Sequence, residues 1–364
     1  MKYISKIMQA SVPNSGLCCY IARCSFFLLA LLTVACSDSQ EALMEDYSKR
    51  IERLSQVPAV HSVQVLHPVP PQVSELRKTL PDVRISLLDS FRLSNCRLGQ
   101  VVAERNSSLG KVMTPANQLL YEVEVTRALR DCLSQPANLS QQLKEDLASA
   151  LASKERSLHL AIHNFLTTDD IWRQQFRVGS KGLPLHNQDD FTNTYIAISY
   201  FAHTLTLLAE SPYHVDLDLS SWHTHVETLH RSQFLPAYWR TLAYMPAQLD
   251  AISVQLQQAR SHIGCSPVAR PQSAEYMHNV MMSLYIGQLQ PALARWHHYG
   301  QQLEPELNQL LALVQKNAWR SHAQALGLGA VQKLQESTRQ HTKQWQDLLQ
   351  ACRLTPHGNP INGA

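Results

Sequence analysis

The segment FTNTYIAISYFAHTLTLLA, residues 191–209, decides between a membrane protein and a helical bundle. It contains no charged residue, and its length is close to the ~20 residues that a membrane-spanning helix needs. Its polar side chains argue against a span: Thr192, Asn193, Thr194, Ser199, His203, Thr204 and Thr206. A helix that is apolar on most sides but carries many hydroxyl groups is typical of a bundle interior. We therefore expect residues 191–209 to form the central buried helix of a bundle.

Apolar residues recur at helical spacing along most of the remaining chain. Three such stripes are Leu43, Tyr47, Ile51 and Leu54; Leu143, Leu147, Leu151, Leu158, Ile162 and Phe165; and Leu326, Ala330, Leu334, His341, Trp345, Leu348 and Cys352. Five prolines between residues 56 and 83 exclude a continuous helix there. The sequence therefore predicts an all-α fold, an irregular multi-helix bundle with a Pro-rich extended segment near the N-terminus.

The expected organisation follows from these patterns and from the leader described next. We expect a cleaved leader at 1–35, an anchored N-terminal helix at 36–56 and the Pro-rich extended segment at 57–83. The helical bundle follows at 84–353, and a tail at 354–364.

The segment FFLLALLTVACSDSQ, residues 26–40, begins with an apolar run that follows a basic stretch. This order is typical of a signal peptide. Its Thr33-Val34-Ala35-Cys36 resembles the lipobox of bacterial lipoproteins, although Thr33 departs from the usual Leu. The resemblance implies cleavage before Cys36 and acylation of that cysteine, including a palmitate-type chain, which anchors a protein stably. Ser37 then implies outer-membrane delivery, with the body on the periplasmic face. The alternatives are an ordinary cleaved signal or an uncleaved membrane helix.

The charge balance excludes one class of partner. The chain has 32 basic and 29 acidic residues, and the leader holds three of the basic ones, Lys2, Lys6 and Arg23. The remaining chain is therefore formally neutral. Because nucleic-acid binding requires clustered Lys and Arg, we expect no nucleic-acid partner.

Four cysteines remain once the leader and Cys36 are set aside: Cys96, Cys132, Cys265 and Cys352. An even number in an oxidising compartment favours two disulfides, for which three pairings exist. If residues 86–110 and 115–134 form an antiparallel hairpin, Cys96 and Cys132 lie nearly level, since each residue rises about 1.5 Å. We therefore predict Cys96–Cys132, and Cys265–Cys352 by elimination.

The densest polar run is SNCRLGQVVAERNSSLGKV, residues 94–112. One interpretation is a hairpin held by ion pairs, with Arg97 level with Asp131 and Arg105 level with Glu124. The other is a polar pocket in which Glu104 acts as a base or ligand and the arginines bind an anion. A carboxylate beside two guanidinium groups stays ionised, which suits anion binding better than proton transfer. The candidate pocket residues are Arg97, Gln100, Glu104, Arg105, Asn106 and Ser108.

This run, preceded by ISLLDSFRL and followed by NQLLYEVE, resembles a family of uncharacterised lipoproteins of gammaproteobacteria, described as a domain of unknown function. The resemblance covers most of the chain after the leader. It implies an envelope lipoprotein and assigns no catalytic residue.

Histidines give a second candidate site, for a metal ion. His159 and His163 are four residues apart on a predicted helix and could chelate a metal from one face. The alternative is that both belong to an ordinary solvated or half-buried helix face. Further possible ligands are His223, His225, Glu227, His230, His297 and His298.

Catalysis has no local signature in this sequence. Neither a Gly-x-Ser-x-Gly elbow nor a phosphate-binding loop after a strand is present. The aromatic residues of the second half could line a groove for a sugar or peptide, or form the core: Trp222, Tyr238, Trp239, Tyr244 and Trp296. We expect no cofactor and leave catalytic residues unassigned.

Two functions remain open. The first is a non-enzymatic helical module that binds or scaffolds an envelope protein while its lipid anchor holds it to the membrane. The second is an envelope enzyme or metal-binding protein that uses Glu104 with Arg97 and Arg105, or the His159–His163 pair.

Overall fold

The structure, a computed structural model, describes residues 39–81, 96–106, 112–134, 139–186, 189–211, 217–266 and 270–354. The predictions for Cys36, Ser108, the leader and residues 355–364 of the tail fall outside these ranges. The chain from Ser39 onward forms one compact unit. This unit is all-α, and no strand occurs among the described residues, as the apolar spacing predicts.

Helix α2, Gln40–Ser55, opens the described chain. The Ser39 side chain accepts a hydrogen bond from the Ala42 amide and caps the helix. The predicted stripe of Leu43, Tyr47 and Ile51 is buried. The helix ends at Gln56, whose left-handed conformation (φ 59°) directs its amide back to the Glu52 carbonyl. This cap turns the chain into the Pro-rich segment.

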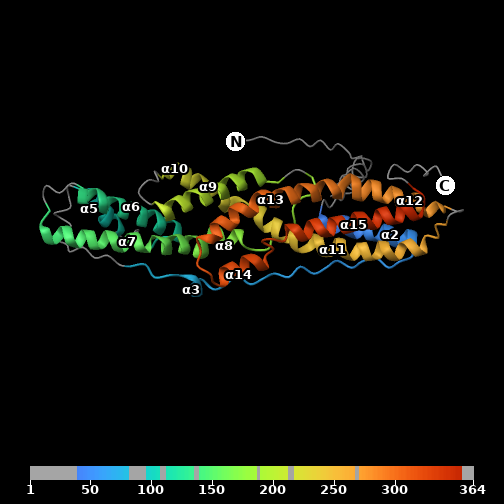
Figure 1. The fold of residues 1–364 in the computed structure, drawn as a ribbon, viewed down its shortest axis with the longest axis horizontal. Coiled ribbons are helices and arrows are strands. Elements are labelled where there is room, and N and C mark those ends of the chain that lie inside the picture. Colours follow the sequence, from blue (N-terminus) through green and yellow to red (C-terminus); the bar gives the residue numbers. More distant parts are fainter. Residues whose placement is uncertain are drawn as a thin grey trace, which may run out of the picture. The chain divides into compact units, whose positions relative to one another are not determined.

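The chain between α2 and the polar region lies extended along the helices, and we call residues 57–81 the strap. Its only helical turn is α3, Val73–Leu76. Figure 1 shows it passing along α11 to α3. Prolines fix φ and push the preceding residue into an extended conformation, so the strap forms no internal ladder of hydrogen bonds.

Side chains of the helices supply the hydrogen bonds that the strap lacks. Ser48 accepts from the Val60 amide at 2.7 Å, and Gln248 accepts from the Val63 amide at 3.1 Å. Gln255 Nε2 donates to the Pro58 carbonyl at 3.1 Å. Because buried backbone groups need partners, these contacts fix the path of the strap.

Three helices form a small core near the first disulfide. They are α5, Arg97–Asn106; α6, Pro115–Ser134; and α7, Gln141–Thr168. Their shared core consists of Leu98, Val101, Val125, Ala128, Leu129, Cys132, Leu143, Leu147 and Ala150. The Cys96–Cys132 disulfide joins the residue before α5 to α6, with a Cα–Cα distance of 5.6 Å. This is the predicted pairing.

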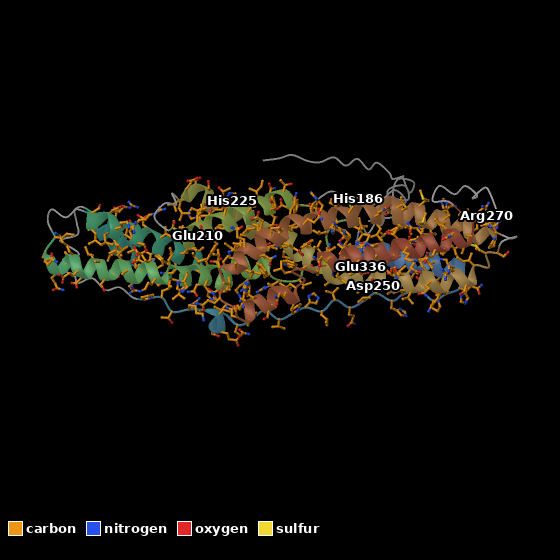
Figure 2. The ribbon with its side chains drawn as sticks, viewed as in Figure 1. His186, Glu210, His225, Asp250, Arg270 and Glu336 are labelled. Carbon is orange, nitrogen blue, oxygen red and sulfur yellow. A yellow bond between two sulfur atoms is a disulfide. The ribbon has the colours of Figure 1, made fainter. Side chains whose placement is uncertain are left out.

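The main core is built mostly from the later helices. Among them are α8, Asp170–Gln175; α9, Phe191–Glu210; α10, Leu219–Arg231; α11, Phe234–His262; and α15, Val331–Ala351. Helix α11 packs along α2 and α15. Asp250 of α11, labelled in Figure 2, pairs with Lys333 of α15 at 2.8 Å. All six tryptophans are buried, so the aromatic residues form core and not a groove.

Helix α9 corrects the prediction for residues 191–209 in one respect. It packs against α13, Gln290–Ala312, and α10, and buries Phe201 and Leu205. Its opposite face is open, because Ile196 and Leu207 are exposed. The uncharged sequence is therefore a half-buried helix and not a central one. No helix in the described part of the chain combines the length and the hydrophobicity that crossing a membrane requires.

The last third contains a rare helical form. Helix α12, Gln272–Val280, continues without a break into the π-helix η3, Met281–Leu289, and then into α13. Helix α14, Ala318–Ala325, precedes α15. The second disulfide, Cys265–Cys352, joins the segment after α11 to the end of α15, with a Cα–Cα distance of 5.0 Å. It is also the predicted pairing.

Candidate functional site

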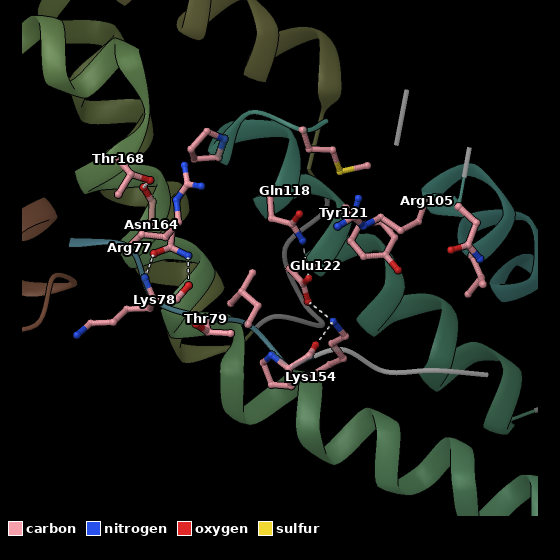
Figure 3. A pocket seen from close by; sticks show the side chains of 16 residues that line it. Arg77, Lys78, Thr79, Arg105, Gln118, Tyr121, Glu122, Lys154, Asn164 and Thr168 are labelled. Atoms are coloured by element: carbon pink, nitrogen blue, oxygen red, sulfur yellow. Dashed lines mark hydrogen bonds and ion pairs between the residues drawn. The ribbon is translucent and has the colours of Figure 1, made fainter. Parts of the chain in front are cut away.

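A polar pocket of about 780 Å³ lies where the end of the strap meets α5, α6 and α7 (Figure 3). Its size is within the ~300–1,000 Å³ that small-molecule sites occupy. The strap supplies Arg77, Lys78, Thr79, Leu80 and Pro81; the helices and the segment before α6 supply Val102, Arg105, Asn106, Met113, Pro115, Gln118, Tyr121, Glu122, Lys154, Asn164 and Thr168.

A buried ion pair forms one wall of this pocket. Lys154 Nζ of α7 lies 2.8 Å from Glu122 Oε2 of α6. Gln118 Nε2 donates to the other oxygen of Glu122 at 2.7 Å, and Lys154 also donates to the Pro81 carbonyl at 3.2 Å. The carboxylate and the ammonium therefore satisfy each other and tie α6, α7 and the strap together.

Side chains of α7 hold the strap by hydrogen bonds where the strap lines the pocket. Asn164 accepts from the Lys78 amide at 2.7 Å and donates to the Lys78 carbonyl at 2.8 Å. His163 Nε2 donates to the Leu76 carbonyl at 3.0 Å. These bonds use only backbone atoms of the strap, and Figure 3 shows the Lys78 side chain directed away from the other lining residues.

Asp169 holds the start of α6 in place beside the pocket. Its carboxylate accepts from the Ala116 amide at 2.9 Å and from the Ile171 amide at 3.1 Å. It thus caps α8 and contacts the first turn of α6 at the same time. Burial raises the pKa of Asp169, although the two amide donors favour its ionised form.

Among the described residues that line the pocket, Arg77, Lys78, Arg105 and Lys154 are basic and Glu122 is acidic. The Arg105 guanidinium lies 5.6 Å from the centre of the Tyr121 ring, and Lys154 Nζ lies 5.9 Å from it. The ring therefore has two cations close to it, an arrangement that its π electrons favour.

The predicted pocket residues divide between this cavity and the surface. Arg105 and Asn106 line the cavity. Arg97 instead pairs with Glu124, and Gln100 donates to Glu104 at 3.2 Å on the exposed face of α5. An ion pair between α5 and α6 is therefore present, as the hairpin interpretation predicts, but Arg97 pairs with Glu124 and not with Asp131. Leu98 and Val101 take the inner face of α5, which turns Arg97, Gln100 and Glu104 towards solvent.

The two histidines of the candidate metal site do not act together. His163 is buried under the strap, and burial lowers its pKa. His159, one turn earlier, is exposed. Within the described ranges, no group of three or more His, Cys, Asp or Glu side chains could hold a metal ion.

The other histidines of the metal hypothesis lie elsewhere. His225 of α10, labelled in Figure 2, stacks on the Tyr200 ring of α9, and the ring centres are 4.2 Å apart. Glu227 pairs with Arg231 one turn along the same helix. These contacts are packing and surface interactions.

Sequence reasoning missed the residues that define the pocket, namely Arg77, Lys78, Gln118, Glu122 and Lys154. A signal was present, because Glu122 is spaced with Leu119, Thr126 and Leu129 on one side of α6. Lys154 is similarly spaced with Ala150, Leu158 and Ala161 on α7. An acid and a base on the apolar sides of adjacent helices predict a buried pair.

Comparison with known proteins gives one match. A family described as "Protein of unknown function (DUF3080)" matches residues 44–356. Neither the curated proteins nor the solved structures contain a significant match to the chain.

Proposed function

Because the chain belongs to this family of unknown function, its role has to be argued from its own residues, and we propose that it is a lipid-anchored envelope lipoprotein. In this proposal the body is a non-enzymatic helical module that binds its ligand or partner on the periplasmic face of the outer membrane.

The anchor follows from the sequence around Cys36. Acylation of this cysteine would place the lipid only three residues before Ser39, the cap of α2. The body would then lie close to the membrane surface. Two disulfides, Cys96–Cys132 and Cys265–Cys352, support an oxidising compartment, because such bonds rarely persist in the cytosol.

The bonding of Glu122 is the observation that favours binding over catalysis. A general base must be able to take a proton from a substrate. The Glu122 carboxylate is instead held by Lys154 and Gln118. It supports the pocket wall, and the cations around it are suited to recognition.

The strap also offers a surface for a protein partner. Leu66 and Val69 are 85% and 83% exposed, which is unusual for large aliphatic side chains in a packed domain. Pro68, Pro70 and Pro71 favour the polyproline II conformation around Val69, in which every third side chain lies on one edge. We propose that this edge, Leu66 with Val69, docks into an aromatic-lined groove of an envelope protein.

Site-specific photocrosslinking in cells tests this function. A photoreactive phenylalanine derivative at Val69 should give one adduct of defined mass with an envelope protein. The matched control is the same group at Tyr276 of α12, which is also exposed. Adducts at Val69 and not at Tyr276 support the proposal, whereas equal labelling at both sites, or none at either, contradicts it.

A further inference from the structure

We propose that two buried side chains of the body, Gln248 and Arg173, are positioning residues that keep the Leu66–Val69 edge of the strap turned towards solvent. This rests on the proposed function, in which that edge docks into a groove of the partner. A hydrogen bond on each side of the edge fixes the rotation of the strap about its own axis, and we call these two bonds the clamps.

The aliphatic residues of the strap share a spacing but not an environment. They recur at every third position, namely Val57, Val60, Val63, Leu66 and Val69. This spacing places all of them on one edge of a polyproline II helix. Val57 is buried and Val60 packs against the main core, whereas Leu66 and Val69 are exposed. The strap must therefore rotate between the first and the second half of this edge.

The burial of the next residues places this rotation directly after Val63. Val65, two positions on instead of three, is the next aliphatic residue that packs against the main core. Pro68 and Pro71 follow Val65 at steps of three and are half-buried. The edge that faces the body has thus shifted, and the edge that carries the last two aliphatic residues is left outside.

The clamps lie at the two ends of this exposed stretch. Gln248 of α11 accepts from the Val63 amide at 3.1 Å. Arg173 of α8 donates to the Pro71 carbonyl at 3.0 Å, and its guanidinium carbon lies 5.8 Å from the centre of the Trp319 ring. Both clamping side chains are buried, where close packing restricts their movement. Each clamp therefore holds one end of the stretch in a fixed orientation.

The stretch between the clamps, residues 64–70, has no other polar contact to orient it. The structure describes all of its residues, and none of them forms a hydrogen bond or an ion pair. Burial of Leu66 and Val69 would be favourable, because apolar surface is driven out of water. Both side chains are nevertheless exposed. The clamps oppose their burial, because they fix the rotation of the strap at both ends of the stretch.

Hydroxyl-radical footprinting of the full chain tests the proposal, since the oxidation rate of a side chain follows its contact with water. The test variants are Gln248→Leu, which removes the acceptor of one clamp, and Arg173→Met, which removes the donor of the other. The control is Gln257→Leu, at an exposed position of the same helix α11. Oxidation of the exposed Tyr276 serves as the internal standard, and thermal melting checks that each variant is folded.

We expect the oxidation rates of Leu66 and Val69 to fall about threefold in each test variant, because the released side chains turn out of water. The rates in the control, and the rate of Tyr276 in every protein, should not change. The yield of the photocrosslink at Val69 in cells should fall in parallel with the oxidation rates.

Unchanged oxidation of Leu66 and Val69 in either folded test variant overturns the proposal. An unchanged crosslink yield in a variant whose oxidation falls overturns it as well, because the rotation would then not control docking. Absence of the crosslink from the wild type contradicts the proposed function instead, and the footprint alone then decides whether the clamps orient the strap.

Discussion

The ammonium of Lys154 lies 2.8 Å from the carboxylate of Glu122, and their side chains are only 5% and 3% exposed. This pair connects α6 to α7, and its additional bonds reach Gln118 and the Pro81 carbonyl. Taking two charges out of water is costly, and only close contact and further hydrogen bonds offset that cost. The pair therefore holds α6, α7 and the strap together along one wall of the pocket.

Removing one partner of this pair should be strongly destabilising. Glu122→Leu leaves Lys154 buried without its acid, and we expect the free energy of unfolding to fall by about 3–5 kcal/mol. Urea denaturation measures the change. The double variant Glu122→Leu with Lys154→Met should recover most of the loss, because no charge is then buried.

The exposed pair of Glu45 and Lys49 is the control for this experiment. Glu45→Leu should change the unfolding free energy by less than ~1 kcal/mol. A Glu122 variant no less stable than the Glu45 variant would show that the buried pair does not support the fold.

The stability of the fold should decrease as the pH falls below about 6.5. His341 is buried between Tyr47 and Ser253, at 2.8 Å and 2.9 Å, and burial lowers its pKa to about 3. The unfolded chain takes up a proton near pH 6.5, whereas the folded chain does not, so acid favours unfolding. The contribution of His341 to the free energy of unfolding is fully present above pH 6.5. Below pH 6.5 this contribution falls by ~1.4 kcal/mol per pH unit.

Burial lowers the pKa of His163 and of His322 as well, which steepens this dependence. The raised pKa of Asp169 acts in the opposite direction, at the acidic end. Urea denaturation between pH 7.5 and 5 measures the slope. His341→Gln should reduce it, and the exposed His159→Gln should not. Constant stability across this range would contradict the account.

The strap should loosen when its contact with α7 is removed. Asn164→Ala deletes both hydrogen bonds to the Lys78 backbone, so we expect a loss of about 1–3 kcal/mol. Hydrogen exchange should show lost protection at the Lys78 amide. Asn117→Ala, at an exposed position of α6, should leave that amide protected. Unchanged protection in the Asn164 variant would mean that other contacts hold the strap.

Reduction of the disulfides should lower the melting temperature. Each disulfide contributes about 2–4 kcal/mol, mostly by restricting the unfolded chain. Cys132→Ser and Cys352→Ser should each reproduce part of the effect of a reducing agent, and their effects should add. Equal melting temperatures with and without reductant would show that the cysteines are free thiols.

The helices and the cysteine pairs could be predicted from the sequence, whereas the pocket could not. Apolar spacing identifies stripes such as Leu43, Tyr47 and Ile51, because a helix repeats every 3.6 residues. Pairing of Cys96 with Cys132 needs only two neighbouring helices. The sequence could not show that one face of α9 is exposed, since an uncharged segment does not indicate how many of its sides are covered by other helices.

The pocket depends on contacts between distant parts of the chain. Lys78 meets Asn164 across 86 residues, and Pro81 meets Lys154 across 73. The strap has no periodic pattern, because its backbone bonds end on side chains of other elements. Local reasoning therefore selected Arg97 and Glu104, on the nearest polar run, and missed Arg77 and Glu122.

The mass of the mature N-terminal peptide, isolated from native membranes, tests the proposed function most directly. We predict a chain that begins at Cys36 and carries a diacylglycerol on its sulfur and an acyl chain on its amine. An unmodified Cys36, or a peptide that still contains the leader, would contradict the proposed anchor and location.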